Sequence, residues 1–386
     1  MAHHFFRIIV VTIIFIAIIS FPIINDEIKF VKDMASSENR QMVSKPSLYF
    51  EHLDPYPGQF EKYYNDHFSI RFLLVKYYNL MNLMVFKKSP IPDQVVIGND
   101  GWLFMAGNEI NSYKGNLRFE KSELEALKDE LEYRKQYLNK RGCQFYFLIA
   151  PVKSSIYSDK IPNHIFRVYK QSLGEQLIEY LNKNSEVKPV NVYQVLRLNR
   201  EKEWLYYKLD NHWNQLGAFY AANEALRRIN MDFPEISASS LDEFVIKKTE
   251  TKDGNIISML SNVVIFKDYS FQLTPKSGFL ASDVSPAGYA CVPNFAYPSE
   301  FEKDKEIKNS KKLKILIISD SFGGNVFPFL AEHFGRSVKI FDSWQYKLNE
   351  DIVEKEKPDV VLLISLETGI KNILNFQSRL KNKPAI

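Results

Sequence analysis

A serine near the end of the chain, and an aspartate and a histidine far upstream of it, are the residues best placed for chemistry. Ser321 directly follows the run 314–318, which is apolar after its first residue and typical of a buried parallel strand. Two glycines and a segment predicted to be helical over 326–334 come next. A hydroxyl at such a junction can be a nucleophile, with backbone N–H groups nearby to stabilise an oxyanion. The alternative is that Ser321 only caps the helix.

Asp210 and His212 supply what a serine hydroxyl needs to become nucleophilic, a general base and a residue that orients it. In an extended segment, positions i and i+2 project to the same side, so one short piece offers both side chains to one site. Three other interpretations are open: a surface histidine, Asp210 as the N-cap of a helix starting near Trp213, and a metal site. The sequence has no further cluster of histidines or cysteines to complete a zinc site.

Together these segments resemble the SGNH-hydrolase-like O-acetyltransferases of exported polysaccharides, namely the alginate acetyltransferase AlgJ and AlgX group and the proteins named for a DHHW motif. In that family a D-x-H-W segment precedes a G-D-S-F segment, and here the two read 210–213 and 319–322. Ser319 stands where the family has glycine, a residue that lets backbone approach closely. Three further stretches are similar to the family: 65–71, 98–104 and 150–157.

The resemblance implies an α/β fold, an SGNH-hydrolase-like parallel sheet flanked by helices. At about 232–312 the strand–helix pattern is lost and short strand-like runs appear, so we predict a small β-rich insertion there. The resemblance also implies that Ser321 carries an acetyl group, that His212 is general base and then general acid, and that Asp210 orients His212. The backbone N–H of Ser321 is the expected oxyanion donor. Further oxyanion or substrate contacts are expected from a wider set of residues: Ser319, Gly323, Lys153, Tyr157 and Trp213. No metal and no cofactor is expected.

Two alternatives to the transferase activity stay open. A carbohydrate acetylesterase would use the same triad with water as the acceptor, because the difference lies in how the site excludes water. A non-catalytic polysaccharide-assembly protein is the second. The resemblance implies as partners a polysaccharide acceptor and a membrane-bound O-acyltransferase that delivers the acetyl group. A net charge of +4, dispersed along the chain, gives no indication of nucleic-acid binding.

The N-terminus predicts a membrane anchor. Residues 8–24 are almost purely apolar, which is about the minimum for a membrane-spanning helix. Arg7 precedes the run while Asp26 and Glu27 follow it, so the positive-inside rule places the N-terminus in the cytoplasm. A cleaved signal peptide is the alternative, but no A-x-A-like site follows the run. We therefore predict a single-pass transmembrane anchor over 1–25 and a periplasmic or extracellular catalytic domain.

The rest of the chain is predicted to comprise a linker with an N-terminal helical segment over 26–95 and a catalytic domain over 96–386. The linker includes a polar tether at 33–41 and a helical stretch at 60–86. The two cysteines, Cys143 and Cys291, are not predicted to pair. Within the domain, helices are expected at 122–138 (opened by a capping box at Ser122 and Glu125), 171–182, 214–228 and 367–379, and strands at 143–150, 190–195, 262–266, 338–341 and 360–364.

Overall fold

A computed structural model describes residues 2–31, 42–50, 53–260 and 267–381 of the 386-residue chain. The predicted tether at 33–41 and the predicted strand at 262–266 lie outside these residues. The chain divides into two units. One comprises 1–95 with 252–265, and the other comprises 96–251 with 266–386.

The first unit is helical. Its elements are α1 (Ala2–Ile28), α2 (Pro55–His67), α3 (Arg71–Met81), a π-helical turn (Asn82–Phe86) and the short α10 (Asn255–Met259). The stretch 60–86 is helical as expected, but it is interrupted at Phe68, whose backbone is extended. Asn25 of α1 donates a side-chain hydrogen bond of 2.8 Å to Ser69 Oγ at this interruption. A polar contact with α1 therefore fixes the point where α2 ends.

The N-terminal helix is long and apolar enough to cross a membrane. Its apolar part, His4–Asn25, has 22 residues and a mean hydropathy of 2.8. At 1.5 Å per residue this part spans roughly 33 Å, which matches the hydrocarbon thickness of a bilayer. The apolar helix fits either a membrane anchor or a signal sequence.

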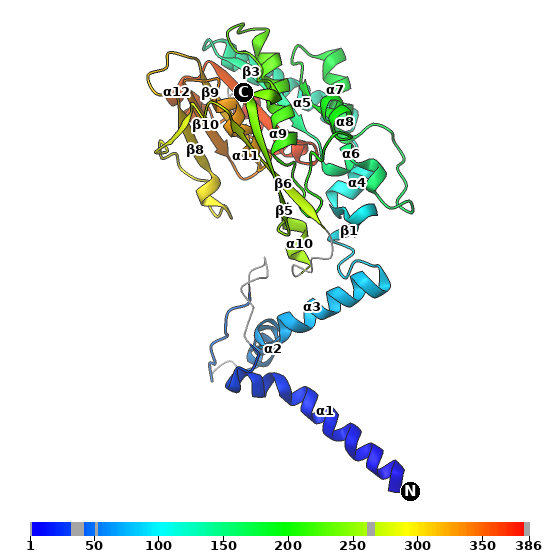
Figure 1. The fold of residues 1–386 in the computed structure, drawn as a ribbon. Helices are drawn as coiled ribbons and strands as arrows, with labels where there is room; N and C mark the ends of the chain where they lie inside the picture. Colours follow the sequence, from blue (N-terminus) through cyan, green and yellow to red (C-terminus); the bar gives the residue numbers. More distant parts are fainter. Residues whose placement is uncertain (1, 32–41, 51–52, 261–266, 382–386) are drawn as a thin grey trace. The chain divides into compact units, whose positions relative to one another are not determined.

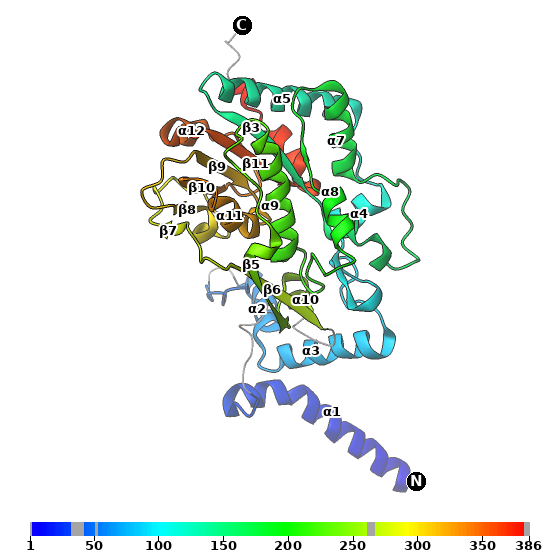
Figure 2. The ribbon, with the colours of Figure 1, turned by 45° about the horizontal axis from the view of Figure 1, so that its top comes forward.

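The second unit is built on a seven-stranded sheet of order β4-β3-β11-β9-β10-β8-β7 (Figures 1 and 2). The first five strands are parallel, and β8 and β7 extend the sheet as an antiparallel edge. The strands in this order are β4 (Val190–Asn191), β3 (Gln144–Ala150), β11 (Val360–Leu366), β9 (Lys314–Ser319), β10 (Arg336–Phe341), β8 (Glu302–Glu306) and β7 (Ser282–Val284). The SGNH-like α/β class expected from the sequence is confirmed.

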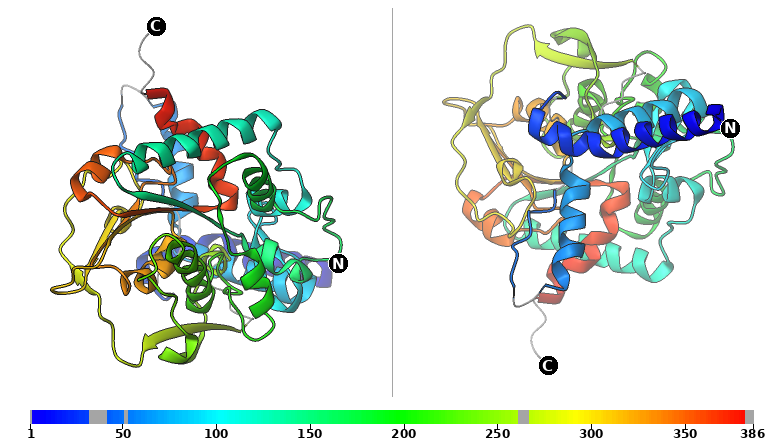
Figure 3. Two further views of the ribbon diagram at one scale, coloured as in Figure 1. Left: turned by 90° about the horizontal axis from the view of Figure 1, so that it is seen from above. Right: turned by 90° about the horizontal axis from the view of Figure 1, so that it is seen from below.

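Helices cover both faces of this sheet (Figure 3). One layer contains α5 (Lys121–Asn139) and α12 (Glu350–Glu356), joined by a hydrogen bond of 3.1 Å from Tyr137 to Glu354. The other contains α9 (Gln215–Asn230) and α11 (Gly323–Ala331), which pack on each other. The central strands are thus buried on both sides, as parallel strands require.

Shorter elements surround the sheet. Two hairpins are β1 (Val95–Ile97) with β2 (Leu103–Met105), and β5 (Phe244–Thr251) with β6 (Asp268–Pro275). The remaining helices are α4 (Asn108–Lys114), α6 (Lys153–Ile156), α7 (Leu173–Asn184), α8 (Tyr193–Asn199) and α13 (Ser378–Lys381), with 3₁₀ turns at Asn99–Gly101, Ser158–Lys160, Leu241–Glu243, Pro298–Glu300 and Glu367–Phe376.

Several boundaries differ from the sequence prediction. The strand expected at 190–195 ends at Asn191, because the chain turns into α8, which buries Tyr193 and Leu196. The capping box of α5 is formed by Glu120 and Glu123, two residues earlier than expected. The helix expected at 367–379 is a 3₁₀ segment followed by α13. The insertion at 232–312 does have β character, but two of its strands, β7 and β8, belong to the central sheet.

Candidate active site

Ser321 lies in the turn between β9 and α11. β9 ends at Ser319, and α11 begins at Gly323. The Gly323 amide donates to the carbonyl of Asp320 at 3.1 Å, and the Gly324 amide to the carbonyl of Ser321 at 3.1 Å. The amide of Ser321 donates no hydrogen bond to any part of the chain that the structure describes. It is therefore available to stabilise an oxyanion on the carbonyl oxygen of an acyl group attacked by Ser321 Oγ.

His212 and Asp210 meet Ser321 although 109 residues separate the histidine from the serine. The Nε2 atom of His212 lies 2.7 Å from Ser321 Oγ, and its Nδ1 atom lies 2.7 Å from Asp210 Oδ1. Asp210 Oδ1 also accepts from the His212 amide at 2.8 Å. With the proton on Nδ1, the imidazole donates to the carboxylate, and Nε2 is free to accept the Ser321 proton. This is the geometry that activates a serine hydroxyl.

Trp213 holds the two segments together. Its indole Nε1 donates to the carbonyl of Phe322 at 3.0 Å, and its own carbonyl accepts from Asn325 Nδ2 at 3.2 Å. Asn214, not Asp210, caps α9, since its side chain accepts from the Leu216 and Gly217 amides. Trp213 is fully buried, so it positions the two segments and does not face substrate, as the sequence had predicted it would.

Lys153 lies beneath the loop that carries Asp210. It is fully buried, and its Nζ donates to the carbonyls of Tyr207 at 3.0 Å, Lys208 at 3.2 Å and Asp210 at 2.6 Å. Burial lowers the pKa of Lys153 to about 8, against the opposing effect of the nearby Glu109 carboxylate. Lys153 was expected to face substrate. It instead fixes the backbone on which Asp210 is mounted.

Tyr157 is also buried instead of facing substrate. Its ring stacks on Trp102 with centroids 4.2 Å apart, and its hydroxyl accepts from the Leu205 amide at 2.9 Å. Leu205 precedes the loop that carries Asp210 and His212, and its carbonyl accepts from the Asn214 amide at 3.0 Å. Tyr157 therefore braces the start of the segment that ends at His212.

Ser319 and Gly323 pack against each other below the turn. Ser319 is fully buried, and its hydroxyl has no hydrogen-bond partner among the described residues. A Cβ atom at position 323 would lie 2.1 Å from Ser319 Oγ, so only glycine fits there. The Gly323 amide is already bonded to Asp320. Neither residue is placed to donate to an oxyanion, and this corrects the expectation from the sequence.

Asp320 was not predicted as a site residue, yet it fixes the turn that carries Ser321. Its carboxylate accepts from the Phe322 amide at 2.8 Å, the Tyr346 hydroxyl at 2.7 Å and the Leu366 amide at 2.8 Å. Burial raises the pKa of Asp320, while the three donors favour the charged form. The signal in the sequence was its position beside Ser321. The partners Tyr346 and Leu366 could not be identified from spacing.

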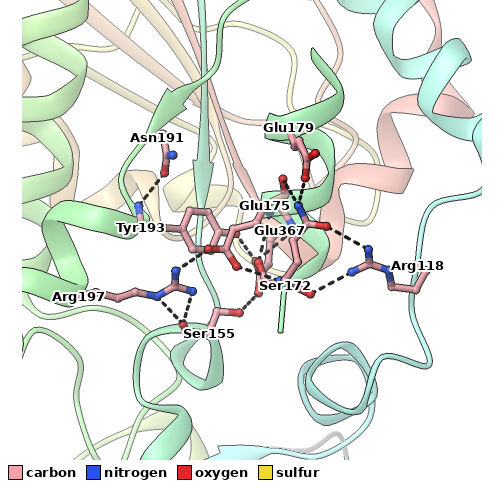
Figure 4. Close-up of polar contacts among 11 residues, drawn as sticks. Arg118, Ser155, Ser172, Glu175, Glu179, Asn191, Tyr193, Arg197 and Glu367 are labelled. Atoms are coloured by element: carbon pink, nitrogen blue, oxygen red, sulfur yellow. Dashed lines mark hydrogen bonds and ion pairs between the residues drawn. The ribbon is translucent and has the colours of Figure 1, made fainter. Parts of the chain in front are cut away.

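A second polar network lies at the end of β11 (Figure 4). Glu367 is fully buried and accepts from Ser155 of α6 at 2.5 Å, from Ser172, the N-cap of α7, at 2.9 Å, and from the Tyr193 hydroxyl of α8. One carboxylate thus ties α6, α7 and α8 to the end of β11. Within the described residues, no group of three or more His, Cys, Asp or Glu side chains could hold a metal ion.

The parallel sheet, with a serine at the end of β9 and an aspartate and histidine on one loop, defines an SGNH-hydrolase-like protein. Residues 95–279 match the family model described as SGNH hydrolase-like domain, acetyltransferase AlgX. The match contains Asp210 and His212 and ends before Ser321. The family resemblance seen in the sequence is confirmed by this match, which supports an O-acetyltransferase.

Solved structures share this fold. PatB1 of Bacillus cereus is 18% identical, covers 74% of this chain and 100% of its own, and has a TM-score of 0.56. PatB1 with a sulfonyl adduct is 17% identical, with coverages of 72% and 99% and a TM-score of 0.54. A DHHW family protein from Eubacterium siraeum is 17% identical, with coverages of 72% and 98% and a TM-score of 0.50. The comparison with curated proteins gave no match.

Proposed function

We propose that this protein is an extracytoplasmic O-acetyltransferase that moves an acetyl group through an acyl-serine intermediate to hydroxyls of an exported polysaccharide. The observation that carries the proposal is the continuous hydrogen-bonded arrangement of Ser321, His212 and Asp210, with both contacts of the imidazole at 2.7 Å. The match to the AlgX acetyltransferase domain supports the choice of acetyl transfer.

In the first half-reaction, Ser321 Oγ attacks the carbonyl carbon of an acetyl donor while His212 Nε2 takes the hydroxyl proton. Negative charge develops on the carbonyl oxygen, and the Ser321 amide is the donor placed to stabilise it. As the bond to the leaving group breaks, the protonated imidazole gives its proton to that group. Asp210 stabilises the cationic imidazole and keeps its orientation.

In the second half-reaction, a polysaccharide hydroxyl loses its proton to His212 Nε2 and attacks the acyl-serine carbonyl. The Ser321 Oγ–carbon bond then breaks, and the imidazole returns the proton to Ser321 Oγ. The products are the acetylated polysaccharide and the free enzyme. The base is used twice without net consumption, as microscopic reversibility requires.

The donor has to reach a site outside the cytoplasm, where acetyl-CoA is not available. A membrane-bound O-acyltransferase is the partner that would deliver the acetyl group across the membrane. The apolar helix His4–Asn25 would keep the catalytic domain at the same membrane. This assignment of partner and location follows from the family resemblance and belongs to the proposal.

The decisive experiment tests the covalent intermediate. Wild-type protein is incubated with an activated acetyl ester. Its intact mass is then measured, and peptide mapping locates any adduct. We expect one acetyl adduct on the Ser321 peptide, and an acceptor glycan should discharge it faster than water does. Discharge by water alone would indicate an acetylesterase. Acetylation of glycan at the wild-type rate by the Ser321→Ala protein would favour a non-catalytic assembly role for this site.

The triad should respond as a unit to substitution. His212→Ala should lower acetyl transfer about as much as Ser321→Ala, because such losses do not add. Asp210→Asn should cost less, since the amide oxygen can still accept from the His212 amide and ring while the negative charge is lost. By comparison with a serine protease triad, Asp210→Asn should retain on the order of tenfold to a hundredfold more turnover than Ser321→Ala or His212→Ala. Single-turnover acetylation rates of the three variants test this order.

A further inference from the structure

A pocket of about 360 Å³ lies entirely within the second unit, and two of its lining residues, Gln215 and Asn325, come three residues after His212 and four after Ser321. Its polar lining includes Gln215 of α9, Gln272 and Thr274 of β6 and Asn325 of α11, and its apolar lining is Phe279, which follows β6, with Leu273, Pro328 and Phe329. The volume is within the range of small-molecule sites, which is about 300–1,000 Å³.

Two lining residues connect the pocket to the segments that carry Ser321 and His212. Asn325 comes four residues after Ser321, and its Nδ2 donates to the carbonyl of Trp213, the neighbour of His212. Gln215 opens the helix that follows His212, and its Oε1 accepts from the Leu273 amide at 2.8 Å. The pocket wall and the triad therefore share two segments of the chain, 210–215 and 321–325.

The lining fits an uncharged, hydroxyl-rich ring. Amide and hydroxyl side chains at Gln215, Gln272, Thr274 and Asn325 can both donate and accept hydrogen bonds. Phe279, 49% exposed, offers an apolar face to the carbon side of a ring. The charged side chains of the lining, Asp283 and Lys305, are paired at 2.8 Å. Their charges cancel, so the wall presents no net charge to a ligand.

We infer that this pocket binds an uncharged sugar residue of the acceptor polysaccharide and sets which hydroxyl reaches the acyl-serine. The inference rests on the proposed function for its role in transfer, but binding itself does not need the chemistry. It also separates two steps: the donor ester reacts at Ser321, while the acceptor chain is held by β6 and α11.

The test uses the full chain with the Ser321→Ala substitution, so that binding is measured without turnover. Cellopentaose and chitopentaose serve as uncharged probes and a galacturonate pentamer as the acidic one, with binding followed by titration calorimetry. In this background, Thr274→Trp should fill the pocket and weaken binding of the uncharged probe at least tenfold. Thr249→Trp is the matched control, because Thr249 is exposed on the same hairpin outside the pocket.

Each outcome has a consequence. Binding of an uncharged probe that is lost in Thr274→Trp and kept in Thr249→Trp supports the inference. The inference is overturned if neither uncharged probe binds, if Thr274→Trp binds as tightly as its parent, or if the galacturonate is preferred. In the active protein, Thr274→Trp should form the Ser321 adduct at the normal rate and lose only its discharge by glycan. Absence of the adduct in wild type, with pocket binding intact, would instead refute the acyl-transfer proposal.

Discussion

At position 153 a charged side chain is fully buried, which costs free energy unless its protons are matched to acceptors. Three carbonyls of the loop 207–210 supply those acceptors. Glu109 and Asp268, both buried, add negative charge nearby, and Asp268 Oδ2 accepts from the Leu209 amide of the same loop at 2.9 Å. The ammonium group of Lys153, with the carboxylates of Glu109 and Asp268 near it, therefore fixes the loop that carries Asp210.

Replacing Lys153 by Met should misplace Asp210 and lower the acetylation rate by roughly tenfold to a hundredfold, since small displacements of catalytic groups have costs of this size. With the lysine present, activity should also fall as pH rises through about 8, where Lys153 loses its proton. The pH–rate profile of wild type against Lys153→Met tests this, with the exposed Lys170→Met as control. An unchanged alkaline limb in Lys153→Met would exclude Lys153 as its source.

Stability should change in the opposite direction. Burial lowers the pKa of Lys153 from 10.5 to about 8, so the unfolded chain binds more protons than the folded chain between these values. The free energy of unfolding should therefore rise with pH across this window, by up to about 3 kcal/mol. Urea denaturation at pH 8 and 10.5 measures the rise, and the contribution of this residue should disappear in Lys153→Met.

Ser319 and Gly323 form a pair in which each restricts the other. Gly323→Ala should lower both stability and acetylation, by about 1–3 kcal/mol for the overpacking, because the new Cβ meets Ser319 Oγ and Cβ. Ser319→Gly removes both atoms and should rescue Gly323→Ala. A double-mutant cycle in urea denaturation measures the coupling. If the two substitutions change the free energy of unfolding additively, the Cβ atom added at position 323 is accommodated by movement of other atoms of the turn.

The sequence predicted the residues of the triad better than those that position them. Ser321, His212 and Asp210 carry chemically distinct side chains at spacings that point to one site, and the structure brings them together. Lys153 was singled out, but as a substrate contact. Its acceptors are main-chain carbonyls, which leave no mark on the residue types of the loop, so its place beneath Asp210 needed the fold.

At the scale of elements, the sequence predicted the strands that are buried on both faces and missed those at the antiparallel edge. β8 reads Glu-Lys-Asp-Lys-Glu over 302–306, without the apolar alternation that marks a strand. Its charged side chains pair with β10, since Arg336 binds Asp304 at 2.8 Å and Glu306 at 2.7 Å, and Arg336 also binds Glu356 of α12 at 2.7 Å. Pairing of that kind depends on which strands become neighbours, and local sequence does not specify this.

The network at Glu367 makes a prediction about how α6, α7 and α8 are attached. Glu367→Ala should lower the free energy of unfolding by about 3 kcal/mol or more, because Ser155, Ser172 and Tyr193 each lose a buried acceptor. Glu367→Gln keeps one acceptor oxygen and should lose less. Equilibrium urea denaturation measures both. The exposed Glu179 (Figure 4) provides the control, and Glu179→Ala should leave the midpoint nearly unchanged.

On the scale of the whole molecule, the apolar helix and the sheet that carries the site belong to different units. The helix exposes large apolar side chains along its length, with Phe15 at 61% and Ile18 at 65%. Such a surface is stable only when it is covered, and 22 residues are enough for a bilayer to cover it. Arg7 near the start of this helix, and Asp26 and Glu27 just after it, favour export of everything that follows.

The last prediction therefore concerns topology. Protease added to intact cells, or to spheroplasts where an outer membrane is present, should digest the domain that contains Ser321. An N-terminal tag should stay protected on a fragment that still contains the helix His4–Asn25, because the anchor is retained and its N-terminus is cytoplasmic. A mature protein without the tag would show that the helix is a cleaved signal peptide. A catalytic domain that resists protease until the cells are lysed would place it in the cytoplasm and contradict export, since His212 and Ser321 would then lie apart from the exported polysaccharide.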